Sequence, residues 1–255
     1  MYDNYSFNGP VEEKTYVTKA NANAVLVKSF LYMFIGLLIT AVVSIGIAIP
    51  LGIGFKDAIA ANDTQKIEDL TAIFYGIMIA CGIGVIIMTF VNQFVFLKGR
   101  HSLWVPFIIY TVLMGGLISS LVLFLDWQTL AMALGITVIA FGVMTLIGVF
   151  SKGNMNIYLV VGMSLLFSCI ILSLFLWIMS LVNPGMVTGL YWLVTFGFLA
   201  AIMLLTIWDI HNIKRMGESG ISNKNVPLYC ALVLYSDFIY IFIRIALILA
   251  KLKKN

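Results

Sequence analysis

Two apolar stretches near the end of the chain, AIMLLTIWDIHNIK (201–214) and VPLYCALVLYSDFIYIFIRIALIL (226–249), each carry one aspartate. Of the chain's eleven acidic residues, only these two, Asp209 and Asp237, lie inside segments long and apolar enough to cross a membrane. A carboxylate at bilayer depth costs about 2.5–3.5 kcal/mol on insertion scales, so it usually faces a protein interior and marks a pathway. We therefore expect the function to centre on this pair.

The composition predicts an all-α polytopic membrane protein. Hydrophobic residues make up 62% of the 255 residues and charged residues only 10%, against roughly 25% charged residues in soluble domains. The apolar runs are continuous rather than alternating, which excludes a transmembrane β-barrel. Run lengths predict seven transmembrane helices, over residues 30–53, 70–97, 103–125, 127–150, 157–182, 187–213 and 226–249.

Local signals set the expected ends of several helices. Pro50, followed by a Gly-Ile-Gly-Phe turn, is expected to end the first helix. Gly217 is a natural stop for the sixth helix. Asn225, with Pro227 just inside, predicts the start of the seventh helix.

The chain divides into a polar tail (1–29), a seven-helix bundle (30–250) and a short basic tail (251–255). The first tail lacks the pattern of a cleaved signal peptide. Nine basic residues fall on the N-terminal side of the predicted spans and five on the opposite side. This asymmetry predicts a multi-pass protein of the cell membrane, or of an organelle in a eukaryote, with a cytoplasmic N-terminus. The basic C-terminal tail disagrees, and a seventh segment that re-enters the membrane would remove the conflict.

The spacing of the sixth and seventh helices allows the two aspartates to meet. Asp209 lies roughly 10 Å before Gly217, and Asp237 lies roughly 16 Å after the start of the seventh helix. A shift of about one helical turn would bring the carboxyls together. Such a pair either passes a cation, calcium being suited to carboxylate oxygens, or shares a proton as a pH-sensitive latch. The structural alternative is a pair buried by hydrogen bonds alone.

Basic residues near the predicted pair are candidates to complete the site. Arg100 and Lys98 follow the second helix, and Arg100 is suited to a bidentate bond with Asp209. Both also fit ordinary membrane-border anchors. Arg244 lies two helical turns after Asp237, where it either serves as a counter-charge or reaches the interface.

The stretches IWDIHNIKRM (207–216) and 226–249 resemble the C-terminal signature of the Bax inhibitor-1 family. The resemblance implies seven short-looped helices around a central seventh helix. It places Asp209 and Asp237 on the two family aspartates, a pH-responsive pair in a calcium-leak pathway. It also places the basic end of the second helix on a latch region, where an arginine bonds the sixth-helix aspartate. The chain differs at Tyr240, usually asparagine, and at Arg244, which comes three residues earlier than the usual arginine.

The function expected on these grounds is a pH-sensitive calcium leak channel, with Asp209 and Asp237 as the ion pathway and Arg100 or Lys98 as the latch. The expected partners are the bilayer, calcium and protons, and no cofactor or nucleic acid is expected. The alternatives are a scaffold that modulates other membrane proteins, such as proteases, and a proton-coupled transporter. An intramembrane aspartyl protease is disfavoured because Trp208-Asp209 and Tyr235-Ser236-Asp237 differ from the Tyr-Asp and Gly-x-Gly-Asp motifs of such enzymes, so no enzymatic activity is expected. The three cysteines form no CxxC pair, and no metal site is assigned.

Overall fold

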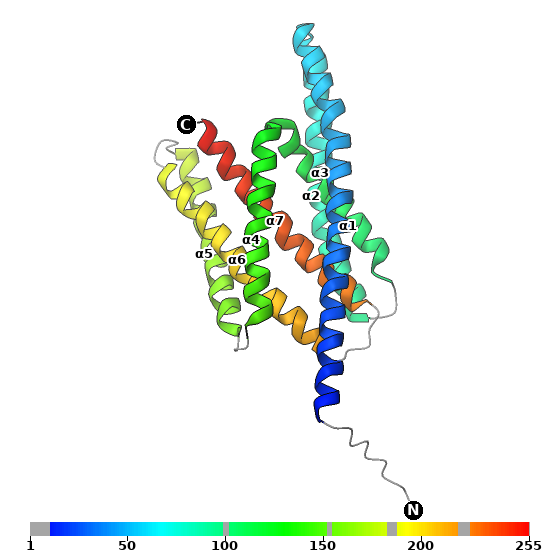
Figure 1. Cartoon of the computed structure of the whole chain (residues 1–255). Coiled ribbons are helices and arrows are strands. Elements are labelled where there is room, and N and C mark those ends of the chain that lie inside the picture. Colours follow the sequence, from blue (N-terminus) through cyan, green and yellow to red (C-terminus); the bar gives the residue numbers. More distant parts are fainter. Residues whose placement is uncertain (1–10, 99–101, 152–154, 183–187, 219–224, 255) are drawn as a thin grey trace, which may run out of the picture.

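The computed structural model describes residues 11–98, 102–151, 155–182, 188–218 and 225–254, and these are almost entirely helical (Figure 1). Seven helices follow one another: α1 (Val11–Ala60), α2 (Thr64–Lys98), α3 (Trp104–Phe124), α4 (Trp127–Phe150), α5 (Asn156–Val182), α6 (Thr188–Glu218) and α7 (Val226–Lys254). Each of the seven is long and apolar enough to span a membrane. The predicted all-α, seven-helix membrane fold is confirmed.

One of the predicted helix ends is wrong. Pro50 lies inside α1, which continues to Ala60 and turns at Asn62, a residue with a positive φ of 51°. Ending the helix at Pro50 would leave several backbone groups of the apolar run unpaired, whereas a proline inside a helix forfeits one hydrogen bond. Gly217, the predicted stop of the sixth helix, lies one residue before Glu218, the last described residue of α6.

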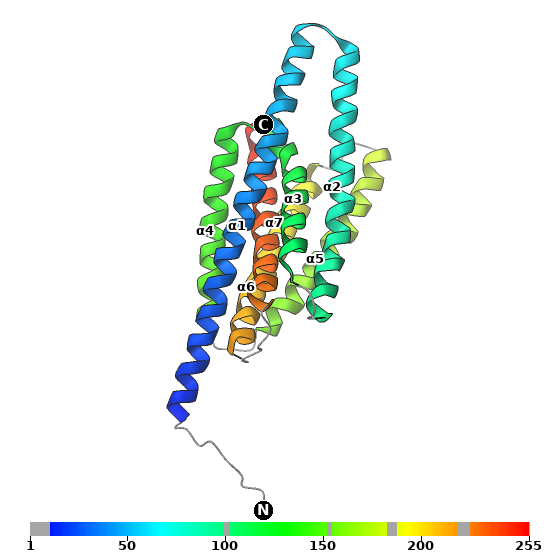
Figure 2. The same cartoon turned by 90° about the vertical axis from the view of Figure 1, so that its right-hand side faces the viewer.

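Helix α7 occupies the centre of the bundle, as the family resemblance implied. It contacts α1, α3, α4 and α6, which surround it in Figure 2, while α5 packs against α6. Its side chains form much of the buried core, with Leu234, Tyr235, Ile241 and Ala246 fully buried. By contrast, α2 and α5 expose many large apolar side chains, as expected for helices that face lipid.

Glycines allow two pairs of helices to approach closely. A Cβ on Gly115 of α3 would lie 2.8 Å from Val43 Cβ and 3.0 Å from the Thr40 carbonyl oxygen of α1. A Cβ on Gly148 of α4 would lie 2.9 Å from the carbonyl oxygen of Ile207 on α6. Small residues at helix contacts are typical of membrane bundles, where association depends on close packing.

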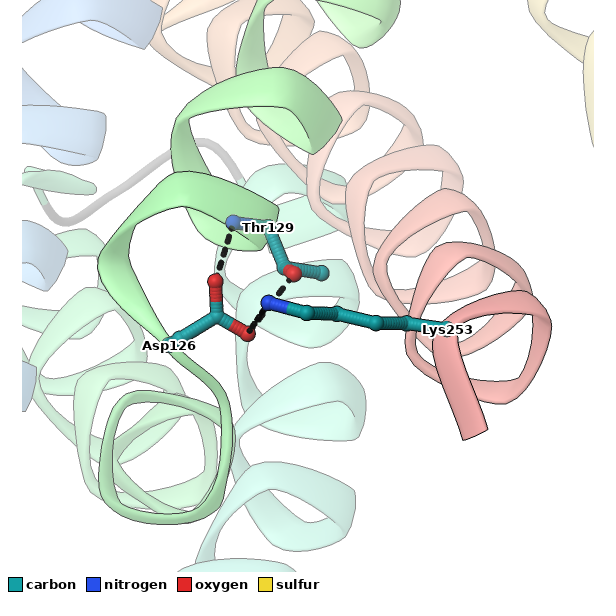
Figure 3. Close-up of polar contacts among 3 residues, drawn as sticks. All are labelled: Asp126, Thr129 and Lys253. Carbon is teal, nitrogen blue, oxygen red and sulfur yellow. Dashed lines mark hydrogen bonds and ion pairs between the residues drawn. The ribbon is translucent and has the colours of Figure 1, made fainter. Parts of the chain in front are cut away.

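The C-terminal end of α7 is held at the end of the bundle opposite the chain's N-terminus (Figure 1). There Lys253 Nζ lies 3.0 Å from Asp126 Oδ1, and Asp126 caps α4 by accepting hydrogen bonds from the backbone N–H and hydroxyl of Thr129 (Figure 3). Helix α7 is unbroken and extends as far as this ion pair. Its length fits a seventh segment that crosses the membrane rather than re-entering it.

Asp126 keeps its charge in the ion pair with Lys253 at neutral and mildly acidic pH. The bond from Lys253, followed by those from Thr129, lowers the pKa of Asp126 to about 2. A carboxylate whose pKa is lowered by folding gives its stabilisation above the unfolded pKa of about 3.9 and loses it as the pH falls towards the folded value. Asp126 therefore stays ionised throughout the range from about pH 5 to 8.

Helix α6 is anchored to the end of α4 close to the aspartate pair. Lys214 Nζ donates to the Val149 carbonyl oxygen at 2.8 Å, and His211 Nδ1 lies 3.4 Å from the Gly148 carbonyl oxygen. These carbonyls belong to the last turn of α4, where a helix has no internal donors left. The two side chains from α6 supply partners for them.

Candidate functional site

The register between α6 and α7 decides which residues of the two helices meet. Arg244 of α7 lies over the ring of Phe198 on α6, and seven residues later Lys251 lies over Tyr191, seven residues earlier on α6. Nearer the middle of both helices, Thr206 is a side-chain partner of Asp237. This antiparallel register brings Asp237 within about one turn of the position facing Asp209.

The carboxyl groups of Asp209 and Asp237 lie close enough to interact with each other. The predicted meeting of the two aspartates is thus present in the structure. Ionised carboxylates only accept hydrogen bonds, so a bond between them requires a proton on one of the two.

The surroundings of Asp237 leave one oxygen without a partner. Its Oδ2 is buried and contacts no hydrogen-bond donor among the described residues. The neighbouring Thr206 hydroxyl, a side-chain partner of Asp237, lies 2.9 Å from the Ile202 carbonyl oxygen and has one proton to share between the two acceptors. A buried acceptor without a donor is costly, and a proton or a cation would satisfy it.

The aspartate pair does not form a closed metal site. No group of three or more acidic, histidine or cysteine side chains suited to a metal ion occurs in the part of the chain that the structure describes. Calcium held tightly takes six to eight oxygen ligands. Two carboxylates and a threonine hydroxyl supply fewer oxygens than that.

An aromatic stack lies beside Asp209, where α2 ends and α7 begins. The rings of Phe96 on α2 and Tyr229 on α7 stack with centroids 3.9 Å apart and planes 11° apart. Tyr229 is close enough to Asp209 for their charges to interact. Leu103, Phe107 and Leu228 form a buried apolar cluster against the same rings. These five residues, here called the aromatic plug, fill the space between the ends of α2, α3 and α7.

The predicted latch residues fall at the edge of what the structure describes. Arg100 lies outside the described residues, and Lys98 is the last residue of α2, with no described side chain. The described contact between the end of α2 and the start of α7 is the Phe96–Tyr229 stack. The latch role of Arg100 or Lys98 stays a prediction.

Arg244 lies away from the aspartate pair. Its guanidinium is 4.3 Å from the centre of the Phe198 ring, and no ion pair joins it to Asp237 or Asp209 among the described residues. Two helical turns, roughly 10 Å, separate Arg244 from Asp237 along α7. The structure thus does not bring Arg244 into contact with the pair as a counter-charge.

Further polar side chains line α7 on either side of Asp237. Ser236 contacts the hydroxyl of Tyr110 at 3.2 Å, and Tyr110 also bonds Tyr240. The hydroxyl of Tyr235 bonds Thr40, which donates to the Thr111 carbonyl oxygen at 3.0 Å. Sequence reasoning did not assign these roles, although a tyrosine–serine pair beside Asp237 in an apolar run was a usable signal.

The comparison with protein families gives a match over nearly the whole chain. The model of the family described as "Inhibitor of apoptosis-promoting Bax1" matches residues 22–254. The chain belongs to the Bax inhibitor-1 family. The match covers both aspartates and all seven membrane helices, so family membership no longer depends on the C-terminal motifs alone. No curated protein and no solved structure matches the chain significantly.

Proposed function

We propose that this member of the Bax inhibitor-1 family is a pH-sensitive, calcium-permeable leak channel gated by Asp209 and Asp237. The observation that carries the proposal is the contact between two carboxyl groups inside a membrane bundle, with one buried oxygen lacking a donor. A proton shared by the pair holds α6 and α7 together at this point. When the proton leaves, the two negative charges repel each other and offer oxygens to a cation.

Calcium flux from proteoliposomes, measured between about pH 5 and 8, tests this function. The full-length protein is expected to leak calcium at a rate that depends on pH. Empty liposomes set the background rate. A rate equal to that background at every pH would contradict the channel and favour a scaffold that modulates partner membrane proteins.

The continuity of the helices argues against a proton-coupled transporter. Many transporters bind their substrate at discontinuous membrane helices. Each of the seven helices here is unbroken over its described length. An enzymatic role has no support either, since no motif of a known membrane protease accompanies the aspartates.

In this proposal the aromatic plug closes the ion pathway between the aspartate pair and the end of the bundle where α2 ends and α7 begins. Its removal should therefore raise the calcium leak. Aromatic pairs contribute about 1 kcal/mol beyond their area, so Tyr229→Ala should raise the open population about fivefold. Calcium flux at fixed pH measures the change. Phe94→Ala is the matched control, because Phe94 lies on the same helix as Phe96 with 60% of its surface exposed. Equal rates for the two variants would exclude the plug as a gate.

We further propose that the N-terminus lies in the cytoplasm and that the protein resides in the cell membrane, because more of the basic residues that flank the helices fall on the N-terminal side. With this orientation, the turn between α1 and α2 lies outside the cell. A single cysteine introduced at the exposed Asn62, in a variant without its native cysteines, should react with an impermeant thiol reagent on intact cells. Reaction only after cells are opened would reverse the orientation.

A further inference from the structure

Two buried side-chain oxygens have no hydrogen-bond donor in the part of the chain that the structure describes. One is Oδ2 of Asp237, and the other is Oδ1 of Asn92 on α2. Asn92 is 1% exposed, and its Nδ2 donates to the Met88 carbonyl oxygen at 2.8 Å, so its oxygen is the atom left over. A buried acceptor without a donor destabilises a protein, whereas leucine has nearly the same shape and would avoid this cost. Packing alone therefore does not account for an asparagine here.

Asn92 lies one helical turn from the aromatic plug. It comes four residues before Phe96, whose ring stacks on Tyr229 of α7. Helices α2 and α7 run in opposite directions (Figure 2), so one turn back along α2 corresponds to one turn forward along α7. Asn92 therefore lies level with Val233, about 6 Å from the stack and towards the aspartate pair.

The aspartate of α6 lies at the same level of the central helix. Arg244 of α7 lies over the ring of Phe198 on α6, and the two helices are antiparallel. Eleven residues lead forward along α6 from Phe198 to Asp209, and eleven lead back along α7 from Arg244 to Val233. Two independent ring contacts thus place Asn92 and Asp209 level with the same residue of α7.

Val233 of α7 faces between α2 and α6. Residues four apart on a helix differ in direction by about 40°. Tyr229 faces α2, and Asp237 has Thr206 of α6 as a side-chain partner, so Val233 points between these two directions. Helices α2 and α6 do not contact each other within the described residues, and Val233 is partly exposed although α7 is the central helix. The amide and the carboxyl therefore flank one partly exposed strip of α7.

We propose that Asn92 lines the ion pathway and offers its amide oxygen to the cation between the aspartate pair and the aromatic plug. This inference rests on the proposed calcium leak and adds one ligand to it. Amide carbonyl oxygens are ordinary calcium ligands, and conduction depends on weak binding at several successive sites. The amide has no charge to gain or lose near neutral pH, so it binds the cation without taking part in the pH response.

Calcium flux and thermal unfolding of Asn92→Leu, measured on the full-length protein, test this role. Leucine removes the oxygen and nearly keeps the shape, so the Tm should stay the same or rise. The flux should fall about tenfold at every pH, because a contact with a charged group is lost, and the pH profile should keep its shape. Gln93→Leu is the matched control, since it removes the amide of the exposed neighbour on α2 and should leak like the wild type.

The outcomes separate this inference from the channel itself. A leaking wild type, with equal flux in Asn92→Leu and Gln93→Leu, would overturn the role of Asn92 and leave the channel standing. A wild type that leaks no faster than empty liposomes would refute the channel and the role of Asn92 with it.

A cysteine variant keeps the test decisive if Asn92→Leu loses stability. Asn92→Cys, in a protein without its native cysteines, should leak calcium and be blocked by cadmium, because thiolates bind soft metal ions. Gln93→Cys should not be blocked. Absence of block at Asn92→Cys, or equal block of the two variants, would contradict a place for Asn92 in the pathway.

Discussion

Asp237→Asn is expected to leave the protein folded and to remove most of the pH dependence of calcium flux. The amide has the shape of the carboxyl and still donates to Asp209, but it cannot lose its proton near neutral pH. In the wild type, one titrating proton can change the population of the conducting state by up to about tenfold for each pH unit. The variant should change by less than about twofold between about pH 5 and 8.

The same measurement on Asp209→Asn gives the reciprocal test of the pair. Both variants should flatten the profile, because the shared proton belongs to the two carboxyls together. Asp57→Asn is the control, since it makes the same chemical change at an exposed residue of α1. A wild-type pH profile in both pair variants would refute gating by the aspartates. A flat but measurable flux in all four proteins would keep the channel and remove its pH sensor.

Gly115→Val is expected to produce the largest loss of stability. The new Cβ would lie 2.8 Å from Val43 Cβ and 3.0 Å from the Thr40 backbone oxygen, and the backbone has little freedom to move aside. Overpacking of this kind typically costs about 1–3 kcal/mol. Displacing α1 would also disturb Thr40, which bonds Tyr235 of the central helix. Thermal unfolding in one detergent and lipid mixture measures the change.

Gly46→Val provides the comparison on α1, because a Cβ at Gly46 meets nothing within 4 Å. Both substitutions add a β-branched residue to a helix, so the difference between them isolates the effect of the close approach. An equal fall in Tm would show that helix propensity, rather than the contact of α1 with α3, accounts for the loss.

The fold class could be predicted from sequence because hydropathy is a property of each segment by itself. In a bilayer, a long apolar run has to be helical to satisfy its own backbone, whatever it packs against. The bounds predicted for α4 (127–150) agree with the observed ones for this reason. Pro50 misled because its usual effect on a helix end was outweighed by the need to keep the apolar backbone paired.

The aspartate pair was also visible in the sequence, because an acidic residue in an apolar run is costly and rare. Its neighbours were not. Thr206 and the stack of Phe96 with Tyr229 look like ordinary members of apolar helices until α2, α6 and α7 are placed side by side. The contact of Arg244 with Phe198 likewise depends on the register of two antiparallel helices.

Composition and run length were enough to predict a seven-helix membrane protein with two costly carboxyls in its last two helices. The helix packing was needed to show that Asp209 and Asp237 approach each other, that Arg244 lies on Phe198 away from them, and that Tyr229 stacks on Phe96. Solvation by lipid acts on each helix separately, so the composition of each segment is enough to predict it. Register and side-chain partners arise from packing between helices, where a shift of one turn exchanges every contact.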